Sequence, residues 1–241
     1  MEYPQEQIKP YGSNGSKTEQ VAEMFDNIAP AYDRLNHLLS FDIDKLWRRK
    51  AIQKLRHLHP ERILDVATGT GDFAIQTYKH IHPTEMVAID ISEGMLQQAR
   101  AKAEGLGISF RRADCMELPF ADGCFDVVTV AFGVRNFEHL DQGLCEMQRV
   151  LRKDGRLLVL ELSEPTTFPL KQLYQWYSKA ILPNIGRIVS HDKEAYKYLP
   201  RSIKAFPKAV QVRRILLDDG FSKVNIHRLT GGICTLYEAV K

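Results

Sequence analysis

The chain of 241 residues carries 33 Lys and Arg against 30 Asp and Glu, a net charge of +3, and 44% of it is hydrophobic. That size suits one α/β domain, and so small a charge gives no argument for nucleic acid as a partner. The four cysteines follow neither metal-ligand nor disulfide spacing, which favours reduced thiols and no metal site. No apolar run approaches the ~20 residues of a membrane-spanning helix and no secretory signal is present, so we expect a cytoplasmic protein.

The N-terminal part predicts a tail followed by helices. Residues 1–17, rich in Pro, Gly and Ser, are typical of a flexible tail. From Thr18 apolar residues recur at helical spacing, for example at Val21, Met24 and Phe25. We predict three helical stretches that form a cap over 18–60, within one domain spanning 18–241.

After Pro60, strands and helices alternate, which predicts a mostly parallel sheet with helices on both faces. The expected strands cover 62–67, 86–90, 109–112, 125–131, 155–161, 224–229 and 234–240. The expected helices cover 72–80, 93–103, 142–151 and 209–218. Ser92 is a good N-cap for the second of these helices. We expect the last two of the seven strands to form an antiparallel pair.

Residues 165–206 interrupt this alternation. The segment is rich in aromatic residues and precedes the last helix and strand pair, so we assign it to the substrate side. Its part from Phe168 to Ile188 has the composition of an interfacial helix that contacts a bilayer or lines an apolar channel. Packing of the aromatic side chains on the sheet is the alternative.

A string of small residues follows the first predicted strand. Ala67, Gly69 and Gly71 let the backbone turn sharply and approach a ligand, and Thr70 lies between the glycines. Gly69, Gly71 and Ala74 also satisfy the dinucleotide fingerprint G-x-G-x-x-A. The string therefore predicts a nucleotide-like ligand without separating a methyl donor from NAD.

Carboxylates stand beside this string and at the end of the next strand. Asp90 ends the second strand, where an acid accepts hydrogen bonds from both ribose hydroxyls in either cofactor class. Because Ser92 already suits the helix cap, we assign Asp90 to the ribose. Asp65 is assigned to the cationic end of a methyl donor. Asp72 is left open between that role and capping its helix.

The segment after the third strand favours the methyl donor. Residues 111–120 read Arg-Arg-Ala-Asp-Cys-Met-Glu-Leu-Pro-Phe and lead into Phe125-Asp126. They resemble the methyltransferase segment in which an acid, here Asp114 followed by Cys115, meets the adenine. Dehydrogenases have no equivalent. The resemblance implies a Rossmann-like class I methyltransferase that binds S-adenosylmethionine.

Other stretches are similar to the C-methyltransferases of menaquinone and ubiquinone biosynthesis, over about residues 20–241. Tyr-Asp-Arg-Leu-Asn at 32–36, with Ser40 and Trp-Arg-Arg at 47–49, resembles the N-terminal signature of that family. Where many members carry His between that Ser and Trp, this chain has Asp44. The remaining matches are Phe-Gly-Val-Arg-Asn at 132–136, the stretch 149–163, Asp192, Tyr196 and Leu-Thr-Gly-Gly at 229–232.

This resemblance implies methylation of a ring carbon of a prenylated quinol, with demethylmenaquinol as the expected acceptor. Ionising a quinol hydroxyl with a pKa of about 10 costs about 4 kcal/mol at pH 7. We expect the Arg135 guanidinium to hold the developing phenolate and Asn136 to orient a quinol oxygen. Asp192 and Tyr196 are the next candidates, for substrate contact or proton relay. An ion-paired or surface Arg135 and a merely packed Tyr196 are the alternatives.

Other functions stay open on the sequence alone. The enzyme could act also on a benzoquinol of ubiquinone biosynthesis, or on another small molecule or RNA. Against RNA, the Asn/Asp-Pro-Pro-aromatic motif of base amino methylation is absent after the fourth strand. A donor-binding scaffold without catalysis is the non-enzymatic alternative. We expect a peripheral location at the inner membrane face, with transient membrane contact, and the oligomeric state is not predicted.

Overall fold

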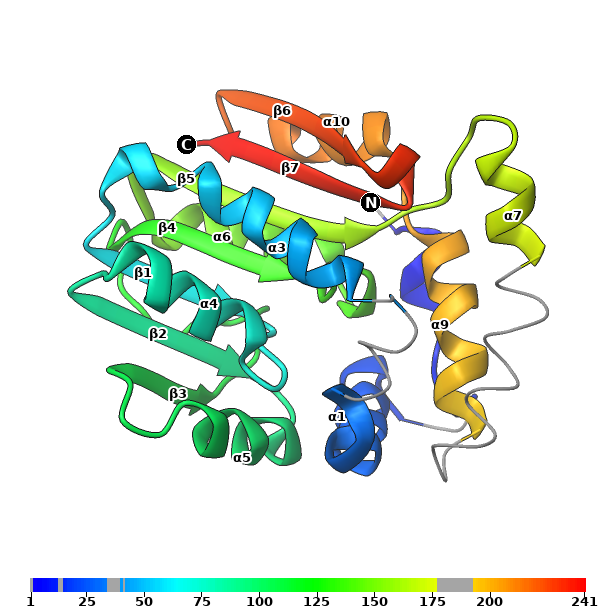
Figure 1. Ribbon diagram of the computed structural model, residues 1–241, viewed down its shortest axis with the longest axis horizontal. Coiled ribbons are helices and arrows are strands. Elements are labelled where there is room, and N and C mark those ends of the chain that lie inside the picture. Colours follow the sequence, from blue (N-terminus) through cyan, green and yellow to red (C-terminus); the bar gives the residue numbers. More distant parts are fainter. Residues whose placement is uncertain (1, 13–14, 34–39, 41, 177–192) are drawn as a thin grey trace.

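The computed structural model describes residues 2–12, 15–33, 40, 42–176 and 193–241 (Figure 1). At its centre lies a seven-stranded sheet of order β3-β2-β1-β4-β5-β7-β6. β7 runs antiparallel to β5 and β6, and the other neighbours pair in parallel. The expected α/β fold is therefore confirmed. The strands are β1 Arg62–Val66, β2 Glu85–Asp90, β3 Ile108–Arg112, β4 Phe125–Ala131, β5 Leu151–Leu162, β6 Lys223–Leu229 and β7 Cys234–Val240.

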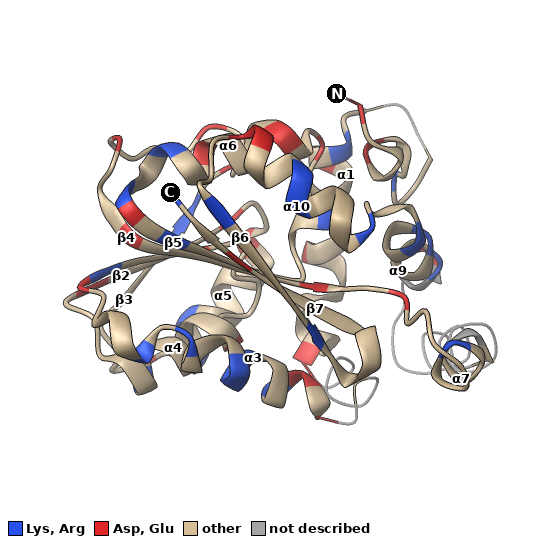
Figure 2. Cartoon of the chain, turned by 90° about the horizontal axis from the view of Figure 1, so that it is seen from above, with Lys and Arg blue, Asp and Glu red and all other residues tan. Residues whose placement is uncertain are grey.

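Helices cover both faces of the sheet, as the view from above shows (Figure 2). α3, α4 and α5 lie on one face, and α6 and α10 lie on the other. The Ser92 side chain caps α5 by accepting from the Met95 backbone N–H, as predicted. The helices are α1 Lys17–Ile28, α3 Ile43–Gln53, α4 Asp72–Ile81, α5 Glu93–Lys102, α6 Leu140–Val150, α7 Leu170–Trp176, α9 Lys193–Ala205 and α10 Ala209–Asp218.

The central strands are apolar on both faces, which the two helix layers require. Leu64 and Val66 of β1 pack toward α6 and α10, whereas Ile63 packs toward α3 and α4. All three side chains are fully buried. The polar residues that interrupt this pattern lie near the carboxyl ends of the strands, where a doubly wound sheet binds its ligands.

β5 begins four residues earlier than the sequence predicts, at Leu151 instead of Gly155. Leu151 pairs with Phe125, and the register then shifts before Val127 pairs with Arg156. Asp154 adopts a left-handed conformation with a φ of 61° inside this irregular stretch. The residues around Asp154 therefore look like a turn in the sequence, although they form a bulge within the strand.

The N-terminal residues correct a prediction. Residues 1–17 were expected to form a flexible tail, but Pro4–Gln7 form a turn of 3-10 helix with Gln5 and Glu6 buried. The Glu6 carboxylate accepts a hydrogen bond from the Leu140 backbone N–H at 2.8 Å. This bond satisfies an N–H at the start of α6 that has no partner within the helix.

The predicted insertion 165–206 contributes α7 and α9, and residues 177–192 between them lie outside the described part. Tyr198 of α9 is buried in a cluster with Val21 and Met24 of α1. No described helix is long and apolar enough to cross a bilayer.

Candidate functional site: a nucleoside cavity and its neighbour

A cavity of about 670 Å³ lies at the carboxyl ends of the parallel strands. The loops after β1, β2, β3 and β4 form one side, and α1 forms the other. Six residues that the sequence assigned to the site line it, namely Ala67, Gly69, Asp90, Asp114, Cys115 and Asn136.

The loop after β1 has the backbone that small residues permit. Ala67, Gly69 and Gly71 all have positive φ angles, of 50°, 56° and 81°. A Cβ added at Gly69 would meet no atom within 4 Å, so this part of the loop faces open space. Gly71 lines neither cavity described here. An added Cβ at Gly71 would lie 3.1 Å from Ala99 Cβ of α5. Gly71 therefore serves packing of the loop against α5.

Asp90 at the end of β2 is buried and faces this loop. One carboxylate oxygen accepts from the Gly69 N–H at 2.8 Å and the other from the Ser92 N–H at 2.9 Å. Burial raises the pKa of Asp90 to about 6. Each oxygen has a further lone pair, so the carboxylate can accept hydrogen bonds from vicinal hydroxyls such as those of a ribose.

Asp114 and Cys115 extend the site beyond β3. Asp114 Oδ1 accepts from the Met116 N–H at 2.9 Å, which fixes the carboxylate at the rim of the cavity. Burial raises the pKa of the Cys115 thiol, so this side chain acts as a small apolar wall. Two acids at the ends of neighbouring strands thus face one cavity, at the place predicted for a nucleoside.

A second cavity of about 350 Å³ adjoins the first on the side of α3 and α4. Asp65 and Thr70, both predicted to bind the cofactor, line it. The Asp65 carboxylate accepts from Thr129 Oγ1 at 2.5 Å and from Thr68 Oγ1 at 2.6 Å, and burial raises its pKa to about 6. Asp72 also lines this cavity. The N-cap of α4 is Gly71 and no side chain caps the helix, so capping does not explain Asp72.

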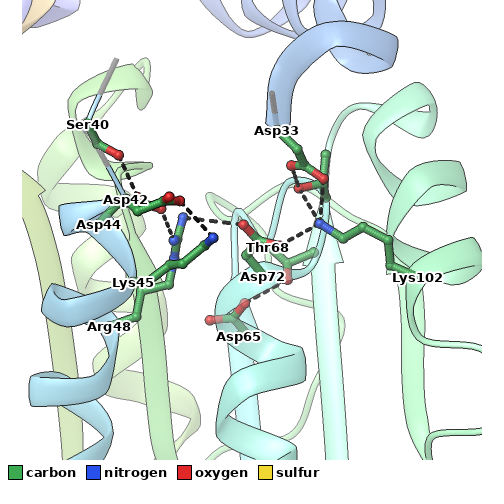
Figure 3. A network of polar contacts seen from close by, with 11 residues as sticks. Asp33, Ser40, Asp42, Asp44, Lys45, Arg48, Asp65, Thr68, Asp72 and Lys102 are labelled. Carbon is green, nitrogen blue, oxygen red and sulfur yellow. Dashed lines mark hydrogen bonds and ion pairs between the residues drawn. The ribbon is translucent and has the colours of Figure 1, made fainter. Parts of the chain in front are cut away.

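The N-terminal signature surrounds the loop from outside the sheet. Tyr32 lines both cavities. Asp33 accepts from the Thr70 hydroxyl and from Lys102 Nζ, and Lys102 also donates to Asp72 at 2.5 Å (Figure 3). Residues 34–36 of the signature lie outside the described part. Tyr32 and Asp33 could be found in the sequence only through the family resemblance.

The first cavity is also lined by three residues of α1 that no sequence pattern assigned to a site, namely Thr18, Val21 and Phe25. The helix is held beside the cavity by Asp26, whose carboxylate accepts from Ser92 Oγ at 2.6 Å and from the Gly94 N–H at 2.8 Å. Helical periodicity marks the apolar face of α1 but cannot show what that face covers.

The motif after β4 places Asn136 and Arg135 differently. Asn136 lines the first cavity, and its Oδ1 accepts from the Tyr198 hydroxyl at 3.1 Å. Arg135 does not line either cavity. Its guanidinium turns inward, is 6% exposed, and pairs with Glu161 of β5 at 2.8 Å. A buried guanidinium requires an anionic partner, and Glu161 supplies it here. This geometry therefore gives no support to the expected contact between Arg135 and the acceptor, which stays untested.

Lys17 was missed entirely by the sequence reasoning. Its Nζ is fully buried and donates to the backbone oxygens of Gln5 at 2.7 Å and of Arg135 and Phe137 at 3.1 Å each. Burial lowers the pKa of Lys17 to about 8. The lysine thus holds the backbone on both sides of Asn136. No local motif could reveal it, because its partners lie far away in the sequence.

The last two predicted acceptor residues belong to the insertion. Asp192 lies outside the described residues. Tyr196 lies on α9, and the placement of its side chain is likewise not described. Their roles stay predictions.

The sheet with its reversed β7, the small-residue loop and the acids after β2 and β3 define a Rossmann-like S-adenosylmethionine-dependent methyltransferase. The open space beside Gly69 and the two acids Asp90 and Asp114 fit that donor. A family model described as the ubiE/COQ5 methyltransferase family matches residues 13–241, and the chain belongs to this family.

Curated relatives match over almost their whole length. A demethylmenaquinone methyltransferase of Bacteroides fragilis is 55% identical, with 100% of both chains covered. One of Porphyromonas gingivalis is 44% identical, with 98% of each covered. A ubiquinone/menaquinone biosynthesis C-methyltransferase UbiE of Geotalea uraniireducens is 44% identical, with 93% of this chain and 97% of the relative covered.

Solved structures share the fold at low identity. A SAM-dependent methyltransferase from Thermotoga maritima has a TM-score of 0.63 and 18% identity, covering 91% of this chain and 99% of its own. One from Aquifex aeolicus has a TM-score of 0.56 and 18% identity, covering 78% and 88%. The expected fold and methyl donor are confirmed.

Proposed function

We propose that the enzyme transfers the methyl group of S-adenosylmethionine to a ring carbon of demethylmenaquinol. The observation that carries this proposal is the 55% identity, over the whole length of both chains, to a relative named demethylmenaquinone methyltransferase. That alignment includes every residue of both cavities. The apolar side chains of Val21, Phe25 and Phe137 in the first cavity suit a planar aromatic ring.

The chain's own residues divide the binding of the donor between them. Asp90 accepts from the ribose hydroxyls, and Asp114 accepts from the adenine amino group. The loop at 67–71 lies along the donor, with Asp65 near its cationic end. When bound, S-adenosylmethionine supplies an electrophilic methyl group on its sulfonium.

On the acceptor side, Asn136 orients a quinol oxygen. Its Oδ1 accepts from Tyr198 and its amide nitrogen donates to the Phe132 backbone oxygen at 3.5 Å, which leaves one amide N–H to donate to that quinol oxygen. Arg135 acts as a positioning residue, through the pair with Glu161 that fixes the start of the loop. Asp192 and Tyr196 stay the proposed residues for the substrate contact or proton relay.

A bilayer contact would give access to a prenylated substrate. Three large apolar side chains beside or on α7 are strongly exposed, Phe168 at 81%, Leu173 at 57% and Trp176 at 63%. Lys171 lies on the same helix. We assign α7 to the contact with the inner membrane face, where apolar side chains enter the interface and a cation pairs with anionic headgroups.

A benzoquinol is the second candidate acceptor, because a relative at 44% identity is named for both ubiquinone and menaquinone biosynthesis. Mass spectrometry of quinones from cells lacking the enzyme tests both. We expect a naphthoquinone one methyl lighter to accumulate, and complementation to reverse it. Accumulation of a lighter benzoquinone alone would replace the proposed acceptor, and an unchanged quinone profile would refute a role in quinone methylation.

A further inference from the structure

Arg48 of α3 is a buried arginine of the N-terminal signature that the preceding functions leave without a role. Its side chain is 7% exposed, and Nη1 pairs with Asp44. The guanidinium lies 5.5 Å from the centre of the Phe132 ring. Its Nε is buried and finds no hydrogen-bond partner among the described residues. A buried donor without an acceptor is costly, so we expect a bound ligand to supply an acceptor for the Nε side of this guanidinium.

The second cavity lies at this edge and continues the first. Arg48 lines it together with Asp65 and Thr70. The two cavities share Tyr32, Ala67, Gly69, Ala131 and Phe132 as lining residues. A ligand whose nucleoside lies in the first cavity can therefore extend across the loop after β1 into the second.

The charges around the second cavity describe the kind of group that would fit there. Asp65, Asp72 and Arg48 line the cavity. Asp44 pairs with Arg48, and Asp33 and Lys102 bond to each other beside Thr70. This acidic excess favours a ligand end that carries positive charge.

A carboxylate on the same ligand end would need a cation with free donors. Lys102 already donates to Asp33, Thr70 and Asp72, which uses its three N–H groups. Arg48 has its Nε without a partner, and Nη2 lies 3.8 Å from Asp72, beyond hydrogen-bond distance. The Nε–Nη2 edge of a guanidinium matches the two oxygens of a carboxylate.

We propose that Arg48 binds the carboxylate at the amino-acid end of S-adenosylmethionine in the second cavity. The nearby aspartates then balance the ammonium and sulfonium charges of the donor. The proposal rests on the donor half of the proposed function and is independent of which quinol accepts the methyl group. It gives the N-terminal signature a physical role, because α3 would recognise a part of the donor that the sheet loops do not.

Calorimetry with two ligands that differ only in the carboxylate tests this assignment. S-adenosylmethionine and its decarboxylated form are titrated into the full-length wild type, into Arg48→Gln and into Arg49→Gln. Arg49 is the next residue on α3 and is exposed, so it is the matched control. Hydrogen bonds to a charged group correspond to a factor of about 10 to 100 in affinity.

We expect the wild type and Arg49→Gln to bind S-adenosylmethionine about 10- to 100-fold more tightly than the decarboxylated ligand. In Arg48→Gln the ratio of the two dissociation constants should fall to about one, through loss of affinity for S-adenosylmethionine alone. Equal weakening of both ligands would overturn the proposal in favour of a structural role for the arginine. A ratio that survives the substitution would overturn it as well.

A second variant guards against misfolding. If Arg48→Gln fails to fold because the buried Asp44 loses its guanidinium counter-charge, Asp44→Asn with Arg48→Gln removes both charges of the pair. The same ratio is then compared with Asp44→Asn alone. The quinol acceptor takes no part in these titrations. If the ratio of dissociation constants falls to about one in Arg48→Gln but the wild type does not methylate the quinol, only the proposed acceptor is refuted. If the wild type methylates the quinol but the ratio is unchanged in Arg48→Gln, only the role of Arg48 is refuted.

Discussion

The buried pair between Arg135 and Glu161 allows a sharp test of how this site is held. Glu161 is 1% exposed, and its Oε1 accepts from Arg135 Nη1 and from the Leu162 N–H, both at 2.8 Å. Its Oε2 accepts from the Arg135 N–H at 3.3 Å. Both oxygens thus face donors only. In Glu161→Gln the new amide N–H₂ must face a donor in either orientation, and the guanidinium loses its counter-charge.

The cost of this substitution follows from burial. Removing one partner of a buried ion pair destabilises a protein by about 3–5 kcal/mol, because the remaining charge stays buried without compensation. For a chain of this size each kcal/mol lowers Tm by about 2–4 °C, so Tm should fall by roughly 6–20 °C. A surface pair of the same geometry should matter far less, at about 0–1 kcal/mol.

Urea unfolding and thermal melts of three proteins measure the difference. Glu85→Gln is the matched control, because Glu85 pairs with Arg62 at 2.7 Å while the two side chains are 43% and 45% exposed. We expect Glu85→Gln to be close to wild type and Glu161→Gln to lose several kcal/mol. Replacing both members of the buried pair, Arg135→Met with Glu161→Leu, should recover much of the loss. A loss for Glu161→Gln no larger than for Glu85→Gln would refute the reasoning.

Two further predictions concern the donor. Burial raises the pKa of Asp90 to about 6, and donor binding requires the ionised carboxylate. The dissociation constant of S-adenosylhomocysteine should therefore rise as the pH falls, and at pH 5 it should be about tenfold higher than at pH 8 through this group. Calorimetry between about pH 5 and 8 should find a shallower dependence in Asp90→Asn, and an equally steep one would contradict the assignment. Gly133→Ala should cost about 1–3 kcal/mol and weaken donor binding, because the added Cβ would lie 2.6 Å from Ala67 Cβ. Ala67→Gly combined with Gly133→Ala removes that clash, so melts and titrations should recover, and a double variant no better than Gly133→Ala would show that the two loops do not touch.

The sheet and the donor residues could be predicted because their signals are local. Alternating strands and helices set the topology, and a parallel sheet brings the carboxyl ends of its strands to one edge. Ala67, Gly69, Asp90 and Asp114 each follow or end a strand, so their convergence in the first cavity followed from the topology alone. The family resemblance added the choice of methyl donor, which the small-residue loop left open.

The ordered structure of residues 4–7 could not be predicted in the same way. A prediction of flexibility from composition considers only how much apolar surface a segment can bury. Residues 4–7 are held by polar contacts, with Glu6 bound to the Leu140 N–H and Gln5 O bound to Lys17 Nζ. Each contact joins the segment to residues that a local pattern cannot identify. A hydrophilic stretch at a chain end therefore predicts flexibility only where no distant partner satisfies its polar groups.

The orientation of Arg135 was beyond sequence reasoning for a related reason. Its position after a central strand indicates a ligand-facing residue, but Glu161 on the neighbouring strand draws the guanidinium inward. The position of an acid 26 residues later decides the outcome. Asn136, which has no charge to compensate, remains at the cavity and is fixed by Tyr198.

Hydrogen bonds at both ends of α1 join this helix to the loops of the site. On the donor side Asp26 binds the start of α5 through Ser92 and Gly94. On the acceptor side Glu138 accepts from the Lys17 and Thr18 N–H groups at 3.1 and 3.0 Å, so the loop that carries Asn136 caps the helix. Both links join α1 to loops that line the same cavity. The helix therefore sets the distance between the residues that bind the donor and those that face the acceptor, and alignment of these two groups is what methyl transfer depends on.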